Sequence, residues 1–206
     1  LTPKGDNFTI NCTGNIVNNG TWKFSDNSSN GVTVAGASAI SPAVCSGNEW
    51  NFNSESTASI CLLKDLDFQF NITTGNATGA GAVTLRLTGD CEFDAVTVSG
   101  GDTLDCGTHD ITTSGTLTVE GTFTGGSGLH NINSINGNNS TGDITLTSGI
   151  TFLNGGGSGA FSLASGLSNL SFAQGTLVFN QSDGNQRFEF NKAPSSNAKR
   201  MGRVVF

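Results

Sequence analysis

Residues 96–128 read VTVSGGDTLDCGTHDITTSGTLTVEGTFTGGSG, and this stretch decides the fold. Apolar residues alternate with Thr and Ser over short segments, which is the period of a β-strand with one buried face. Almost every segment ends at a glycine, the residue that best permits a tight corner between two strands. No apolar pattern of helical period interrupts the stretch. It predicts a chain wound into stacked coils, that is, an all-β parallel β-solenoid (β-helix).

The same pattern continues toward the C-terminus. Imperfect blocks follow one another from Ala82 onward, and each begins after a glycine and ends in Gly, Ser or Asn. Such repeats are typical of stacked coils, because a single unit cannot bury its apolar face alone. Residues 82–191 are therefore predicted to form solenoid coils, and residues 192–206 a basic C-terminal tail or contact strand.

Residues 1–81 are less regular. They contain short strand-like segments, a turn at Asn18–Gly20 and a dense apolar stretch over residues 48–74. Within that stretch, SICLLKDLDF (59–68) is predicted as strand, with a helical turn as the alternative. An antiparallel sandwich would also give closely spaced strands. We therefore expect an irregular β cap or docking region, with a sandwich-like cap as the alternative.

Composition and charge exclude several function classes. The chain has 206 residues, of which 12% are charged, and a net charge of −7. Nucleic-acid binding is not expected, because a phosphate track needs a basic stripe. No apolar run approaches the ~18–20 residues of a membrane span. The first residue is Leu1, which suggests a removed leader or a piece of a longer protein. Five of the nine basic residues lie at the C-terminal end: Arg187, Lys192, Lys199, Arg200 and Arg203.

The five cysteines are separated by 33, 16, 30 and 15 residues: Cys12, Cys45, Cys61, Cys91 and Cys106. In one interpretation, coils of about that spacing stack the thiols in a buried ladder. In the other, disulfides such as Cys45–Cys61 and Cys91–Cys106 join neighbouring coils. An odd number leaves at least one thiol free or paired outside the chain. The absence of a CxxC motif and of a Cys/His cluster argues against a zinc site.

Acidic residues gather in one part of the chain: Asp90, Glu92, Asp94, Asp102, Asp105 and Asp110. The favoured interpretation is solvated corners of the solenoid. Two alternatives remain: a pair of acids that cleaves a glycan, and a calcium site, for which Asp102, Asp105 and Asp110 are the metal candidates. No catalytic residue and no other cofactor site is predicted, and the protein is not expected to be an enzyme.

Other single residues carry weaker signals. His109 and His130 lack any partner motif and are predicted to lie at the surface or in turns. Trp22 and Trp50 are expected in the core, with a sugar-stacking platform as the alternative. Asn-x-Ser/Thr sequons mark glycosylation candidates in a secreted glycoprotein: Asn7, Asn11, Asn19, Asn27, Asn71, Asn76, Asn138, Asn139, Asn169 and Asn180.

Two segments carry a resemblance to known proteins: NNGTW (18–22) and the run FDAVTVSGGDTLDCGTHDITTSGTLTVEGTFTGGSG (93–128). They resemble β-helical repeat segments of secreted bacterial surface proteins and of phage virion-surface (tail or capsid) proteins. The resemblance implies stacked β-helical coils, a structural, adhesive or glycan-facing role, and a place at the cell exterior or virion surface. It offers no catalytic motif.

These observations favour a non-catalytic structural subunit of an extracellular or virion-surface assembly, such as a fibre, a filament or a capsid or tail surface. The expected partners are other copies of the chain, in a homo-oligomer or filament, or neighbouring structural subunits. Contact by strand addition is expected near Phe8–Ile10 or Val204–Phe206. The alternative is a glycan-binding adhesin or receptor-binding module, and a polysaccharide depolymerase is the least favoured function.

Overall fold

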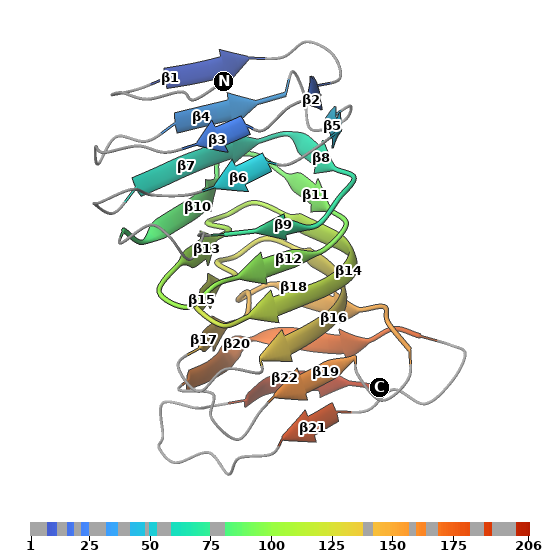
Figure 1. The fold of residues 1–206 in the computed structure, drawn as a ribbon. Coiled ribbons are helices and arrows are strands. Elements are labelled where there is room, and N and C mark those ends of the chain that lie inside the picture. The colour runs from blue at the N-terminus through green and yellow to red at the C-terminus, as the bar shows by residue number, and fades with distance from the viewer. Residues whose placement is uncertain are drawn as a thin grey trace.

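A computed structural model of the chain shows an all-β protein whose parallel sheets form a β-solenoid (Figure 1), which confirms the predicted fold class. No helix occurs among the residues that the structure describes, and hence none long and apolar enough to cross a bilayer. The description covers residues 8–11, 16–18, 22–24, 32–36, 42–47, 50–52, 59–74, 81–137, 142–156, 160–163, 169–181, 188–190 and 201–206.

Three parallel ladders run along the solenoid. The first contains β1 (Phe8–Asn11), β4 (Val32–Ala35), β7 (Ser59–Lys64), β10 (Val83–Leu87), β13 (Thr103–Asp105), β15 (Thr122–Thr124), β17 (Asp143–Thr145) and β20 (Asn169–Phe179). The second contains β2 (Ile16–Asn18), β5 (Ala43–Gly47), β8 (Leu66–Phe68), β11 (Cys91–Phe93), β14 (Ile111–Val119), β16 (His130–Gly137), β18 (Ile150–Leu153), β20 and β22 (Met201–Val205).

The third ladder starts with β9 (Ile72–Thr73) and β12 (Val96–Val98), continues through the C-terminal halves of β14 and β16, and ends with β19 (Phe161–Leu163) and β21 (Phe188–Phe190). A separate parallel pair joins β3 (Trp22–Phe24) to β6 (Trp50–Phe52). The long strands β14 and β16 thus take part in two ladders.

The solenoid extends into the N-terminal part of the chain. β4 pairs in parallel with β7, and β7 pairs in parallel with β10, so one ladder crosses the boundary that the sequence suggested at residue 82. The strand pairs assigned before that boundary are parallel, unlike those of an antiparallel sandwich. Differences in coil length explain why the sequence is irregular. The hydrogen-bonded residues Thr88 and Leu63 of successive coils are 25 positions apart in the sequence, whereas Thr116 and Ser134 are 18 positions apart.

The segment 59–68 forms the strands β7 and β8, as predicted, and not a helical turn. Asp65 makes the corner between them with a φ of 54°, the left-handed conformation that Asp tolerates better than most residues. Its carbonyl accepts the amide of Ala43 at 3.0 Å, which ties this corner to the preceding coil.

The core consists of inward-facing residues stacked from coil to coil. One buried column follows the register Leu85, Leu104, Phe123 and Ile144. In the second ladder the rings of Phe68 and Phe93 stack at 5.3 Å between centroids, with planes 7° apart. Stacking equivalent side chains at each level gives an interior that excludes water along the axis.

The cysteines do not form the predicted ladder. Cys61 is in register with Leu85, and Cys91 with Leu66 and Ile111, so these thiols have aliphatic neighbours on the adjacent coils. The spacing of 15 to 16 residues was misleading, because inter-coil bonds join residues 18 to 28 apart. Cys61, Cys91 and Cys106 are buried free thiols, so neither predicted bridge, Cys45–Cys61 or Cys91–Cys106, is formed. Cys12 lies outside the described residues.

Candidate functional site

Asp90 and Asp110 connect the corners of three successive coils. The Asp90 carboxylate accepts the backbone amide of Asp110 at 2.9 Å, and the Asp110 carboxylate accepts the amide of Leu129 at 2.7 Å. Each acid therefore accepts an amide hydrogen bond at the corner of the next coil. The predicted corner position of these acids is correct, and their role here is structural.

Asp102 is buried at the corner before β13. Its Oδ1 accepts the amide of Val83 at 2.8 Å, while no described residue donates to Oδ2 with hydrogen-bond geometry. Burial raises the pKa of the Asp102 carboxyl above its ordinary value, and the Val83 amide and the Thr74 hydroxyl oppose this rise. Asp102 was predicted as a solvated corner, and its burial corrects that prediction.

Replacing Asp102 tests its structural role. Asp102→Ala leaves the buried Val83 amide without an acceptor, so we expect a loss of about 1–3 kcal/mol in the free energy of unfolding at pH 7. Asp102→Asn keeps an acceptor and removes a charge that burial disfavours, so it should lose less than the alanine variant. The pKa of the Asp102 carboxyl is raised in the folded protein, so its buried charge lowers the free energy of unfolding above that pKa. This penalty is lost as the pH falls through that pKa and the carboxyl is protonated. Urea unfolding of both variants at neutral and acidic pH measures these differences, and equal losses would contradict the account.

The three predicted metal candidates have separate partners. Asp105 forms an ion pair with Arg86, with 2.9 Å between Oδ2 and Nε, and its Oδ1 accepts the Gly107 amide at 3.1 Å. Asp102 and Asp110 accept the backbone amides described above. Among the described residues, no three His, Cys, Asp or Glu side chains are grouped so that they could hold a metal ion.

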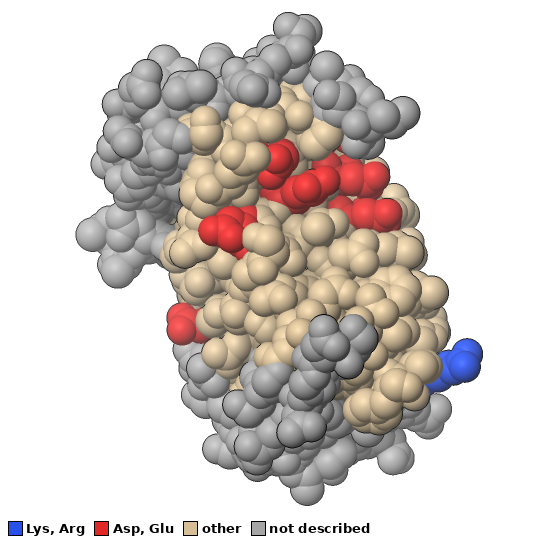
Figure 2. Space-filling view, turned by 90° about the vertical axis from the view of Figure 1, so that its right-hand side faces the viewer, with Lys and Arg blue, Asp and Glu red and all other residues tan. Residues whose placement is uncertain are grey.

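Acidic side chains gather on one face of the solenoid (Figure 2), away from the basic side chain visible on the same face. Asp67 of β8 and Glu92 of β11 are register partners in the second ladder. Asp94 lies just after β11, and its Oδ1 accepts the Ser114 hydroxyl at 2.7 Å. Like charges at directly opposed positions on neighbouring strands repel, so this face gains solubility at a cost in stability.

The two histidines occupy different environments. His109 lies at a corner with its Nδ1 3.8 Å from Asp90 Oδ1, in agreement with the predicted turn position. His130 is completely buried at the start of β16, which corrects the prediction of a surface residue. Burial lowers the pKa of His130 to about 4, and the nearby backbone of Gly125 and His109 opposes this shift.

Burial also governs thiol chemistry. It raises the pKa of Cys91 to about 12 and raises those of Cys61 and Cys106 well above their ordinary value. Because the thiolate is the reactive form, we expect iodoacetamide to modify these three residues roughly a thousandfold more slowly in the native protein than in denaturant. Peptide mapping by mass spectrometry measures this at each residue. Rapid native labelling of any of the three would contradict the buried assignment.

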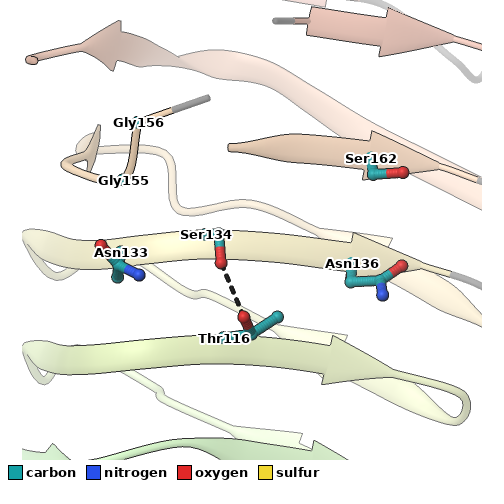
Figure 3. A pocket seen from close by; sticks show the side chains of 7 residues that line it. All are labelled: Thr116, Asn133, Ser134, Asn136, Gly155, Gly156 and Ser162. Carbon is teal, nitrogen blue, oxygen red and sulfur yellow. Dashed lines mark hydrogen bonds between the residues drawn. The ribbon is translucent and has the colours of Figure 1, made fainter. Parts of the chain in front are cut away.

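A polar hollow lies on the outer surface of the third ladder. Its volume is about 400 Å³, and it is lined by Thr116, Asn133, Ser134, Asn136, Gly155, Gly156 and Ser162 (Figure 3). We call it the fork groove, because the partner of β16 on the following coil changes there from β18 to β19. No motif in the sequence predicted this groove. The available signal was Asn133–Ser134, two polar residues that interrupt the alternation between Ile132 and Ile135.

The glycosylation candidates divide by position. Asn71 and Asn180 have exposed side chains, so their sequons are accessible. Asn11 lies in β1 and Asn169 in β20. The remaining sequon asparagines lie outside the described residues: Asn7, Asn19, Asn27, Asn76, Asn138 and Asn139. The side chains of Trp22 and Trp50 also lie outside the described part of the structure, so their expected place in the core stays a prediction.

Comparison of this chain with protein families, curated proteins and solved structures gave no match. The expected fold is confirmed by the parallel ladders, whereas the functional implications of the repeat resemblance stay predictions.

Proposed function

We propose that this chain is a non-catalytic structural subunit of an extracellular or virion-surface assembly, such as a fibre, a filament or the surface of a capsid or tail. One observation carries the proposal: β22 pairs with β20, and its other edge faces no strand of the described chain. An unpaired strand edge presents amide and carbonyl groups in a row, and a strand of another molecule can pair with it.

Two further features support strand addition at this end. Phe206 follows β22 with 82% of its surface exposed, and its ring stacks on Phe179 at 4.9 Å. At the opposite end, β1 pairs with β4 and with no other strand among the described residues. Addition of β1 from a second copy to β22 would continue the parallel ladder. Such head-to-tail contact repeats from copy to copy, and the product is a filament or a ring.

The test compares two charge substitutions. Phe206→Glu places a charge beside the open edge, whereas Ile150→Glu changes a partly exposed apolar residue on the side of the solenoid. Light scattering and electron microscopy should show assemblies for the parent chain and for Ile150→Glu, and mainly monomers for Phe206→Glu. Deletion of residues 200–206 should also impair assembly. A parent chain that stays monomeric, or a Phe206→Glu variant that assembles normally, would overturn the proposal.

The second candidate is a glycan-binding adhesin or receptor-binding module. The fork groove is the observation that favours it, because its lining offers only hydroxyl, amide and backbone groups. The corner acids give less support, since Asp90, Asp102 and Asp110 accept backbone amides and Asp105 pairs with Arg86. A polysaccharide depolymerase would need turnover that Asp102→Asn or Asp105→Asn abolishes, and a lack of turnover on acidic glycans would remove this function.

A further inference from the structure

The fork groove exists because one coil does not follow its neighbour continuously. Ile132 of β16 is in register with Leu153 of β18, and Ile135 is in register with Phe161 of β19. On the two sides of the interruption, Gly155 donates its amide to Asn133 at 2.7 Å, and Ile135 donates to Ala160 at 2.9 Å. Ser134 has no register partner on the β18–β19 side, so the surface is hollow above it.

Backbone packing fixes one wall of the hollow. A Cβ atom at Gly155 would lie 2.4 Å from the carbonyl oxygen of Asn133, so no larger residue fits there without a backbone shift. Gly156 adds no side chain to the same wall, as Figure 3 shows for both glycines. The opening is therefore part of the backbone arrangement and does not depend on a flexible side chain.

The polar atoms of the groove are suited to a ligand that both donates and accepts hydrogen bonds. Thr116 and Ser134 share a hydroxyl–hydroxyl bond of 2.8 Å in which either oxygen can be the donor, so the pair can reorient (Figure 3). Asn136 Oδ1 is buried and accepts no hydrogen bond from the described residues. Asn136 is also the register partner of Ser162, another lining residue. A buried acceptor without a donor is uncommon and indicates a missing partner.

The lining contains no charged residue, although the chain as a whole carries a net charge of −7. A metal ion would find no carboxylate here, and an anion would meet an unfavourable long-range field. A volume of about 400 Å³ is within the range of small-molecule sites. We propose that the fork groove binds a neutral saccharide, whose hydroxyls donate to Asn136 and exchange hydrogen bonds with Thr116, Ser134 and Ser162. This inference rests on the second candidate function, glycan binding, and not on the proposed assembly.

Saturation-transfer difference NMR tests the proposal, because it reads the signals of the sugar and works whether the protein is monomeric or assembled. The probes are neutral tetrasaccharides of glucose, mannose and galactose, with a galacturonate tetrasaccharide as the charged comparison. We expect saturable transfer to at least one neutral probe and weaker transfer to the galacturonate. Titration calorimetry then gives the affinity.

Three variants locate the site. Ser162→Phe fills the groove and should abolish binding, and Asn136→Leu removes the buried acceptor and should weaken binding at least roughly tenfold. Thr97→Ala is the matched control, because Thr97 belongs to the same outward-facing column through Thr118 but does not line the groove. Equal unfolding midpoints verify that the variants fold. The proposal is overturned if no neutral probe binds, or if galacturonate binds as tightly as the neutral probes. It is also overturned if Asn136→Leu and Ser162→Phe bind the neutral probe as tightly as the parent does.

Discussion

Lowering the pH from 7 to 4 should decrease the free energy of unfolding by about 3 kcal/mol through His130 alone. His130 lies in a core column between Ile111 and Thr151, and the ring of Phe123 lies 5.9 Å from its own ring. Neither ring nitrogen has a hydrogen-bond partner of good geometry among the described residues. A proton on this imidazole would therefore create a poorly solvated charge.

The sign of the effect follows from the two pKa values. His130 has a pKa of about 4 in the folded protein and an ordinary value of 6.5 when unfolded. Between these values the unfolded chain binds the proton and the folded protein does not, so stability is complete above pH 6.5 and falls toward pH 4. Below pH 4 both states are protonated, and the loss stops increasing.

His130→Leu should remove this part of the pH dependence and also stabilise the protein at neutral pH, because Leu buries no ring nitrogen without a hydrogen-bond partner. His109→Gln is the matched control, since it removes the other imidazole of the chain, which is partly exposed at a corner, and keeps His130 in place. Urea unfolding between pH 7 and pH 4 measures all three proteins. A His130→Leu variant with the same pH dependence as the parent, or a His130 imidazole that titrates near pH 6.5 in the native protein, would contradict the account.

Gly126→Ala should prevent stable folding, whereas Gly101→Ala should cost only about 1–2 kcal/mol. Both glycines have a positive φ, 65° at Gly126 and 90° at Gly101, so both substitutions introduce the same kind of backbone strain. They differ in what the new methyl group would touch. A Cβ at Gly126 would lie 1.7 Å from the carbonyl oxygen of Gly107 on the preceding coil, while a Cβ at Gly101 would meet nothing within 4 Å.

The collision at Gly126 cannot be relieved by a side-chain rotation, because the obstructing atom belongs to the backbone. The Gly107 carbonyl also accepts the amide of Ser127 at 2.9 Å, so moving it breaks a bond between coils. Circular dichroism and thermal unfolding of the two variants provide the comparison. Similar midpoints for Gly126→Ala and Gly101→Ala would show that these corners are not held at the described separation.

The sequence predicted the solenoid best where the coils are short. Val96–Val98 and Thr122–Thr124 alternate buried and partly exposed residues as expected from their pattern. The prediction placed the start of the coils at residue 82, because longer connections between strands obscure the repeat before that point. Strand pairing across long connections depends on contacts between distant residues, which a local pattern does not reveal.

The site predictions failed where the alternation of residues did not decide which of two neighbours points into the core. Leu129 and His130 are adjacent, and hydrophobicity alone would place Leu129 in the core and His130 outside it. The amide of Leu129 is held by Asp110, and the strand begins at His130 with its side chain inward, so that Leu129 is partly exposed. Similarly, no local signal predicted that Asp102 would turn its carboxylate toward the Val83 amide of the preceding coil.

The continuous ladders also have a consequence for how the protein unfolds. Each coil contacts mainly the coils before and after it, so stability is distributed as a series of nearest-neighbour contributions along the axis. Opening should begin at the terminal strands β1 and β22, which have a partner strand on one side only within the described chain. Amides of β13, β14 and β15 should then exchange with solvent most slowly, because many interfaces must open before theirs. The resistance of the solenoid to unfolding thus depends on whether its two ends are covered.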